Sequence, residues 1–152
     1  VGIRETVTIK GKQTITVADY ESGRAYDDAI CYAFYPVDEH LNGGHGINFR
    51  PLRQGVLPTI PRGALLPADS SFLLVAGRCV ASDREANSAL RVECPCMAMG
   101  QAAGAMAALS ARTGVDPEDL ALEDVRSLLR EHGAILPGDL ANQPAPAGRA
   151  DG

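Results

Sequence analysis

The chain has 152 residues, of which 45% are hydrophobic and 22% are charged. This length and this composition predict one folded unit with a hydrophobic core and exclude a globally disordered chain. The formal net charge is −5 and Lys and Arg form no cluster along the sequence, which excludes a surface built to bind nucleic acid.

The first elements are predicted to be short. Residues 1–9 are rich in β-branched side chains, and a Lys-Gly-Lys turn separates them from residues 13–17, which predicts a hairpin-like start. The dipeptide Arg4-Glu5 on its first strand could reach the substrate side or form a structural ion pair, and the ion pair is the favoured expectation. Residues 16–24 close with a glycine and predict a short helix, and residues 29–35 predict a strand.

Residues 36–66 are dominated by loop signals, namely a Gly-rich segment at 42–46 and several prolines. Two short strands are predicted within this stretch, near residues 47–50 and 59–65. Long loops in compact domains usually carry function. Because His, aromatic and Arg side chains concentrate here, we expect functional residues among them.

His40 and His45 are the candidates for proton transfer, since an unperturbed imidazole titrates near pH ~6.5. Tyr35, Asp38 and His40 fall together in the segment YPVDEH. This grouping favours an active-site loop, and a surface loop with satisfied polar side chains is the open alternative.

Residues 72–76, FLLVA, are apolar throughout and predict a strand buried on both faces, as in a parallel sheet. Gly77 then permits a tight turn. A helix of small residues is predicted to begin near Cys94, with Pro95 in its first turn, and to end before Gly114. A strand end that meets a helix start offers unpaired N–H groups with partial positive charge, which suit a phosphate or a flavin ring oxygen.

The apolar part of this helix is shorter than the ~20 residues that a membrane span needs and contains Gln101, so no membrane span is expected. A second amphipathic helix is predicted over residues 123–132 with a glycine stop. The tail 137–152 is rich in Pro, Ala and Gly and is expected to be disordered.

The four cysteines are Cys31, Cys79, Cys94 and Cys96. They form neither paired C-x-x-C knuckles nor a disulfide-rich framework, so we expect reduced thiols and a cytoplasmic protein. One residue between Cys94 and Cys96 would strain a disulfide. A zinc site from these two and a histidine lacks a second pair of ligands, so no metal is expected.

Taken together, these segments are familiar as a set. Residues 72–109, FLLVAGRCVASDREANSALRVECPCMAMGQAAGAMAAL, resemble the carboxyl-terminal flavin-binding segment of the FAD-dependent oxidoreductase family related to fumarate reductase-like flavoproteins. Upstream motifs match the same family in the same order: GIRETVTIKG, DDAI, YPVDEH, FRPL and IPRGALLP. The resemblance covers residues 1–135.

The resemblance implies an α/β fold, more narrowly an α+β fragment. It would hold the carboxyl-terminal part of an FAD/NAD(P)-binding Rossmann-like domain and part of a β-rich substrate domain. Residues 1–68 would be the partial substrate region, 69–136 the last strand and helices of the FAD-binding domain, and 137–152 the tail. The family's G-x-G-x-x-G fingerprint for the FAD pyrophosphate is not in this chain. We therefore expect the amino-terminal FAD-binding half to be missing.

Residue roles also follow from the resemblance. Gly77 and Arg78 would approach the ribityl and pyrophosphate region of FAD, and Arg91 would lie near the isoalloxazine and the substrate. Backbone amides of a second stretch would face the pyrimidine end of the flavin. The expected cofactor-binding residues are Gly77, Arg78, Ser88, Arg91, Met99, Gly100, Gln101 and Ala102, and the expected catalytic residues are His40, Arg91 and Tyr35.

Structural alternatives remain open for these residues. Gly77 could merely turn the chain, Gly100 and Gly104 could serve helix packing alone, and Arg91 could be an ion-pair partner. The sequence also departs from the family pattern at Asp83-Arg84, where Thr-His or Ser-His is common. A substrate or flavin role of that histidine would be lost or altered here.

The expected function is hydride transfer between a small organic substrate and flavin, by the carboxyl-terminal portion of an FAD-dependent oxidoreductase. Its partners would be the substrate and the missing amino-terminal half, without which the isolated chain is expected to be inactive. The alternative is a non-catalytic fragment or module that keeps the fold but has no redox activity.

Overall fold

The computed structural model describes residues 7–40 and 46–139. The Arg4-Glu5 pair, the first strand of the expected hairpin, His45 and nearly all of the expected disordered tail lie outside these residues. The elements, in chain order, are α1 (Val17–Ser22), β1 (Ala29–Tyr32), β2 (Val37–His40), β3 (Ile47–Arg50), β4 (Thr59–Pro61), a 3-10 helix (Arg62–Leu65), α2 (Arg84–Leu90), α3 (Glu93–Thr113) and α4 (Leu122–Glu131).

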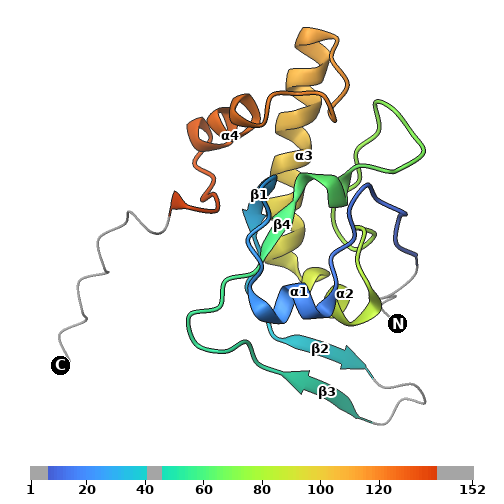
Figure 1. Cartoon of the computed structure of the whole chain (residues 1–152), viewed down its shortest axis with the longest axis vertical. Helices are drawn as coiled ribbons and strands as arrows, with labels where there is room; N and C mark the ends of the chain where they lie inside the picture. The colour runs from blue at the N-terminus through green and yellow to red at the C-terminus, as the bar shows by residue number, and fades with distance from the viewer. Residues whose placement is uncertain (1–6, 41–45, 140–152) are drawn as a thin grey trace, which may run out of the picture.

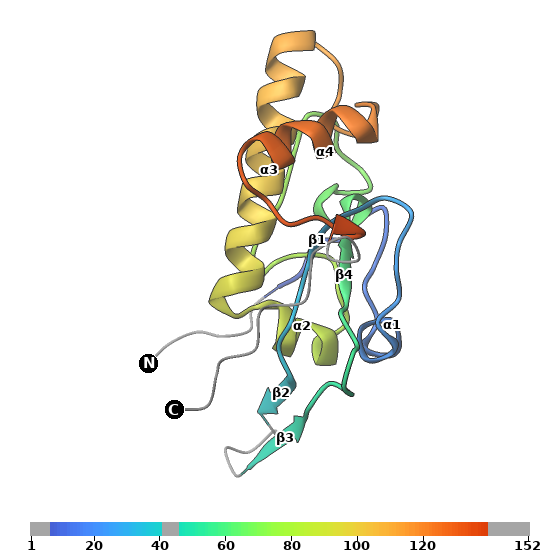
Figure 2. The same cartoon turned by 90° about the vertical axis from the view of Figure 1, so that its left-hand side faces the viewer.

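The strands form two separate antiparallel pairs, β1 with β4 and β2 with β3. The first pair lies against α3, whereas the second extends as a ribbon away from the body (Figures 1 and 2). This mixture of helices and small antiparallel sheets is an α+β arrangement. The expected strands near 29–35, 47–50 and 59–65 are present, the first and last of them shorter than predicted.

β2 falls in the stretch that was expected to be mostly loop. Its four residues pair in register with β3, from Val37 opposite Arg50 to His40 opposite Ile47. A four-residue strand is stable only when a neighbour completes its hydrogen bonds, and here that neighbour lies beyond the Gly-rich segment. The local pattern therefore contained too little information to reveal β2.

A hairpin was predicted within residues 1–17, and this prediction is wrong for residues 7–17, the part that the structure describes. Gly11 forms a β-bridge with Pro67, and Ile15 forms one with Ser82. The segment thus pairs with distant parts of the chain instead of folding back on itself. The β-branched residues predicted extended backbone correctly, but they could not identify its partner.

One hydrophobic core joins the two halves of the chain. α3 packs against β1 on one side and α4 on another, burying Met99, Ala102 and Met106 completely, and α4 contributes Val125 and Leu129. The cluster draws residues from both sides of position 68. None of the described helices is long and apolar enough to cross a membrane.

The ribbon is held to the body partly by charge. Arg50 on β3 donates from Nε to Glu21 Oε1 on α1 and from Nη2 to Glu85 Oε2 on α2, both at 2.6 Å. Hydrogen bonds to the two carboxylates raise the pKa of the Arg50 guanidinium. At the same end of the ribbon, Val37, which lies opposite Arg50 in the register, is fully buried in the core.

Residues 72–76 do not form the predicted buried strand. Phe72 has a φ of 54°, and its N–H donates to Asp116 Oδ2 at 2.7 Å. Val75 N–H donates to Leu65 O at 2.9 Å, yet the side chains of Phe72 and Leu73 are 65% and 48% exposed. An apolar run becomes a strand only beside another strand, and the described residues place none along it.

One carboxylate joins the starts of two helices. Asp83, the N-cap residue of α2, accepts the N–H of Ala86 on Oδ1 and the N–H of Val17, the first residue of α1, on Oδ2, each at 2.7 Å. Its own N–H donates to Ile15 O at 2.9 Å. An N-cap oxygen satisfies an amide that no helical carbonyl reaches, and here one side chain does so for both helices. The sequence did not predict α2, although Asp83 is a strong N-cap signal.

Asp83→Ala is expected to lower the free energy of unfolding by about 2 kcal/mol, because two helix starts lose an acceptor. Urea denaturation followed by far-UV circular dichroism measures the loss. Asp69→Ala is the control, since its side chain is 82% exposed and 3.7 Å from Lys10 Nζ; its cost should stay within about 0.5 kcal/mol. Equal losses for the two variants would contradict the shared-cap account.

Asp116 makes the chain sensitive to acid. Hydrogen bonds from the backbone N–H groups of Glu118 and Phe72 lower its pKa below the ordinary value of 3.8. A lowered folded-state pKa contributes stability that is present above the unfolded-state value and is lost as pH falls through the folded-state value. We therefore expect the melting temperature to decrease as the pH is lowered below about 4. The decrease should be steeper in the parent chain than in Asp116→Asn. Equal slopes of melting temperature against pH for the two chains would contradict the role given to Asp116.

Candidate functional site

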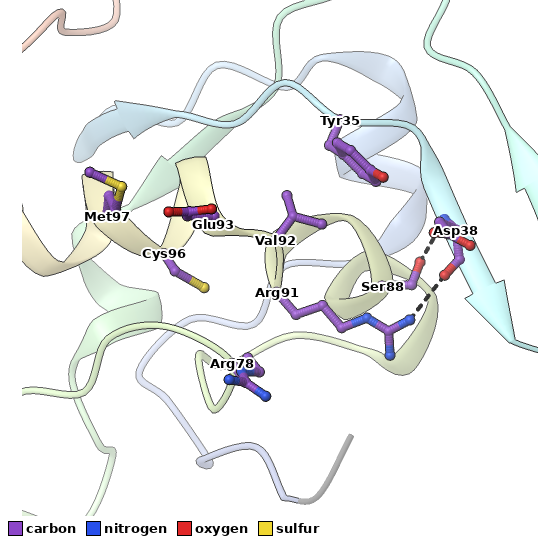
Figure 3. A pocket seen from close by; sticks show the side chains of 9 residues that line it. All are labelled: Tyr35, Asp38, Arg78, Ser88, Arg91, Val92, Glu93, Cys96 and Met97. Carbon is purple, nitrogen blue, oxygen red and sulfur yellow. Dashed lines mark hydrogen bonds between the residues drawn. The ribbon is translucent and has the colours of Figure 1, made fainter. Parts of the chain in front are cut away.

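A cavity of about 720 Å³ lies where the ribbon, α2 and the start of α3 meet (Figure 3). Three segments far apart in the sequence supply its wall: the region around β2, the turn after residue 76, and the α2–α3 junction. The lining residues are Tyr35, Asp38, Arg78, Ser88, Arg91, Val92, Glu93, Cys96 and Met97.

α2 closes the open edge of β2. Ser88 Oγ accepts the N–H of Asp38 at 3.1 Å, and Arg91 Nη2 donates to Asp38 O at 3.1 Å. Arg84 Nη2 donates to His40 O at 3.2 Å. Residues three apart on a helix share one face, so Ser88 and Arg91 reach the same strand edge. Both backbone groups of Asp38 are thereby fixed at the cavity wall.

The Asp38 carboxylate is less well satisfied than its backbone. Its Oδ1 atom is buried and has no hydrogen-bond partner among the residues that the structure describes. Unpaired buried acceptors are rare because they lose their bonds to water without replacement. This atom is therefore an unsatisfied acceptor buried within the ribbon, beside the cavity.

Tyr35 is held in place through its backbone. The hydroxyl of Tyr20 donates to Tyr35 O at 2.8 Å and accepts the N–H of Tyr35 at 3.2 Å. Burial raises the pKa of Tyr20 to about 12, with the bond to Tyr35 acting in the opposite direction. Tyr20 thus stays neutral, and the aromatic side chain of Tyr35 lines the cavity (Figure 3).

The turn that carries Arg78 is fixed from two sides. Val80 N–H donates to Gly77 O at 3.0 Å, and Asn87 Nδ2 on α2 donates to Arg78 O at 3.0 Å. Gly77 has a φ of 86°, and a Cβ added there would lie 3.8 Å from Cys96 Sγ, an ordinary contact. Backbone conformation, not lack of space, is what requires glycine at this position.

The start of α3 leaves two amides without an intrahelical partner. The first intrahelical bond runs from Cys96 N–H to Val92 O at 3.1 Å, and Val92 provides no side-chain cap. Pro95 has no N–H, so the unpaired amides are those of Glu93 and Cys94. They lie at the positive end of a helix of 21 residues, which favours an electron-rich oxygen as their partner.

The structure brings Tyr35, Arg78, Ser88 and Arg91 together at one cavity, as expected for residues of one site. Gly77 lies beside them in the turn next to Cys96. His40 is not a lining residue; it lies on β2, two positions beyond Asp38 and therefore on the same face of the ribbon.

The stretch Met99 to Ala102 does not fit its expected role. α3 begins at Glu93, so the N–H groups of this stretch bond to carbonyls one turn earlier and cannot face a cofactor. Met99 and Ala102 are fully buried in the core, and Gly100 is exposed. Gln101 donates to His132 O at 3.2 Å and lines a different cavity, beside α4.

The sequence analysis grouped Asp38 with Tyr35 and His40 but gave it no role in the site. It did not single out four further lining residues, namely Val92, Glu93, Cys96 and Met97. Pro95 placed the helix start near Cys94 in the sequence analysis, and the same signal could have located the unpaired amides, because they lie just before a proline in the first turn. Burial raises the pKa of the Cys96 thiol while the charge of Arg78 lowers it, and the net shift is upward. Cys96 is therefore a neutral thiol near pH 7.

Gly77→Ala is expected to cost about 1–2 kcal/mol of unfolding free energy, because alanine is strained at a positive φ. Gly104→Ala is the matched control: it lies within α3 with nothing within 4 Å of an added Cβ. That change should stabilise the chain by about 0.5–1 kcal/mol. Denaturant unfolding measures both, and two changes of the same sign would contradict the role given to Gly77.

The residues present fit a flavin in part. Unpaired amides, an arginine and an aromatic wall suit a flat ring system with acceptor oxygens. Among residues 7–40 and 46–139, no group of three or more His, Cys, Asp or Glu side chains is placed to hold a metal ion.

Comparison with known proteins identifies the family of this chain. The family model described as FAD dependent oxidoreductase matches residues 1–129, while no curated protein and no solved structure gives a match. The family carries an oxidoreductase activity, a flavin cofactor and a small-molecule substrate. Because the match spans more than half of its length, the chain belongs to the FAD-dependent oxidoreductase family.

Proposed function

We propose that this chain is the carboxyl-terminal portion of an FAD-dependent oxidoreductase that transfers hydride between a small organic substrate and flavin. The observation that carries this proposal is one cavity lined by Tyr35, Arg78 and Arg91 together with residues of the first turn of α3. Bound flavin would supply the two-electron chemistry, and the protein orients it and tunes its charge.

The amides of Glu93 and Cys94 would donate to the pyrimidine oxygens of the flavin. Arg91 would stabilise negative charge on the reduced ring or on an anionic substrate, since fixed donors aimed at developing charge favour the reaction. Gly77 and Arg78 would face the ribityl and phosphate chain. Ser88 acts through β2, whose edge it holds by accepting the N–H of Asp38.

Tyr35 and His40 are the proposed catalytic residues besides Arg91. Tyr35 is on the cavity wall, where a phenol can orient a substrate. His40 lies further along the ribbon and is the proposed proton carrier, since imidazole changes charge near neutral pH. The proposed partners are this substrate and a chain segment carrying the G-x-G-x-x-G half, with no nucleic acid.

The organisation of the full enzyme follows from the same proposal. Residues 1–68 would be part of the substrate region and residues 69–136 the end of a Rossmann-like domain, although both share the core described above. The proposed compartment is the cytoplasm, in agreement with cysteines that are all free thiols, namely Cys31, Cys79, Cys94 and Cys96.

Titration of the isolated chain with FMN, FAD and ADP tests the proposal. FMN and FAD share the isoalloxazine, whereas ADP carries only the distal half of FAD. We expect weak binding in which FMN and FAD shift the amide NMR signals of Glu93 and Cys94 with similar affinity, and ADP does not. Arg91→Met should weaken both flavins about tenfold, the loss of one hydrogen bond to a charged group.

Arg112→Met is the control for Arg91→Met, since it removes the same charge from the exposed far end of α3 and should leave flavin binding unchanged. Binding of ADP as tight as that of FAD, or FAD bound stoichiometrically and tightly, would overturn the division of the site between two halves. A complete lack of response to FMN would favour the non-catalytic alternative.

A further inference from the structure

The aromatic part of the cavity wall lies outside both sheets. Tyr35 falls in the link between β1 and β2. On one side of it Ala33 N–H donates to Pro58 O at 2.9 Å, and on the other the pairing of β2 with β3 begins at Val37. Pro36 follows Tyr35, and a proline has no N–H and keeps the residue before it extended. The place of Tyr35 therefore depends on a contact that comes from another element.

One buried hydroxyl provides that contact. Tyr20 on α1 is 1% exposed, and its hydroxyl donates to Tyr35 O at 2.8 Å and accepts Tyr35 N–H at 3.2 Å. A hydroxyl is a donor and an acceptor at once, so a single atom serves both backbone groups of Tyr35. It keeps its proton at neutral pH, because burial raises the pKa of Tyr20 to about 12. Tyr20 thus takes the place that a neighbouring strand has in a sheet.

The helix that carries Tyr20 shares an anchor with the helix that carries the arginine of the site. α1 begins at Val17, whose N–H donates to Asp83 Oδ2 at 2.7 Å. The other oxygen of Asp83 caps α2, and Arg91 at the end of α2 lines the cavity. Tyr20 itself does not line the cavity. Its hydroxyl is therefore a direct link through which the common anchor sets the place of Tyr35 relative to Arg91.

We infer that Tyr20 is a positioning residue whose hydroxyl fixes the backbone of Tyr35, so that the Tyr35 ring forms the aromatic wall for the flavin. This inference deepens the proposed function and rests on it. Without the hydroxyl, the N–H and C=O of Tyr35 lose their partner, and the link between the strands settles where water or another group supplies one. A flavin that binds then has to order the ring again, which lowers its affinity.

Tyr20→Phe removes the hydroxyl and keeps the buried ring. We expect it to weaken FMN binding to the isolated chain about tenfold, the effect of losing hydrogen bonds of ordinary strength, and to speed hydrogen exchange of the Tyr35 amide. Tyr26→Phe is the matched control, since it removes a buried hydroxyl that makes no hydrogen bond to Tyr35. Val125→Ala is the control for lost stability, because Val125 is fully buried in α4. Both controls should leave FMN affinity unchanged.

A double-mutant cycle with Tyr35→Ala separates positioning from a merely structural role. Alanine keeps the backbone N–H and C=O at position 35 and removes the ring. If Tyr20 acts through that ring, Tyr20→Phe weakens FMN binding about tenfold in the parent chain and by less than about twofold in Tyr35→Ala. A structural role would give the same factor in both backgrounds.

Two measurements on the parent chain stand even if a variant fails to fold. FMN should shift the ring signals of Tyr35 in the NMR spectrum. The Tyr35 amide should exchange with solvent at least about tenfold more slowly than in an unfolded peptide of the same sequence, because its N–H is bonded to Tyr20.

Equal FMN affinity of Tyr20→Phe and the parent chain, or equal factors in the two backgrounds, overturns the inference. So does an unprotected Tyr35 amide in the parent chain, or FMN binding that leaves the Tyr35 ring signals unshifted. The proposed function fails separately, when FMN leaves the amide signals of Glu93 and Cys94 unchanged. The amide of Tyr35 then decides alone: faster exchange in Tyr20→Phe supports the positioning role, and unchanged exchange overturns it.

Discussion

The docking of α2 against the edge of β2 is the contact on which the site depends. A two-stranded ribbon in water leaves an edge of unpaired backbone groups, and side chains of α2 supply the missing partners through Ser88, Arg91 and Arg84. α2 is itself positioned by the Asp83 carboxylate, which also begins α1. The cavity wall therefore follows from a chain of polar contacts and not from apolar burial alone.

The sequence predicts those elements whose signals lie within the element itself, and the motifs it contains predict the family. The small-residue helix and the glycine after it were predicted because proline and glycine act on their own backbone, and α3 ends as expected with Gly114 in the left-handed region. The irregular backbone of residues 72–76 and the strand β2 were not predicted, because a strand is stable only beside a neighbouring strand. The apolar run 72–76 was taken for a buried strand, yet Phe72 bonds instead to Asp116.

The site was predicted in part for the same physical reason. Tyr35, Arg78, Ser88 and Arg91 have distinctive chemistry and do share one cavity. The amide donors were placed at Met99 to Ala102, although unpaired amides occur only in the first turn of a helix. The place of Asp38 is set by contacts with α2 and β3, so no pattern within YPVDEH could have indicated that its Oδ1 atom is buried.

The end of the ribbon where Val37 lies opposite Arg50 is anchored by two different forces, one for each strand. Val37 is fixed by burial, which salt strengthens or leaves unchanged, whereas Arg50 is held by carboxylates that solvent reaches. Counter-ions screen exposed charges over a distance of about 8 Å at physiological ionic strength. The ionic part of this anchor consequently weakens as ionic strength rises while the apolar part keeps its strength, so the surrounding electrolyte loosens the hold on β3 more than the hold on β2.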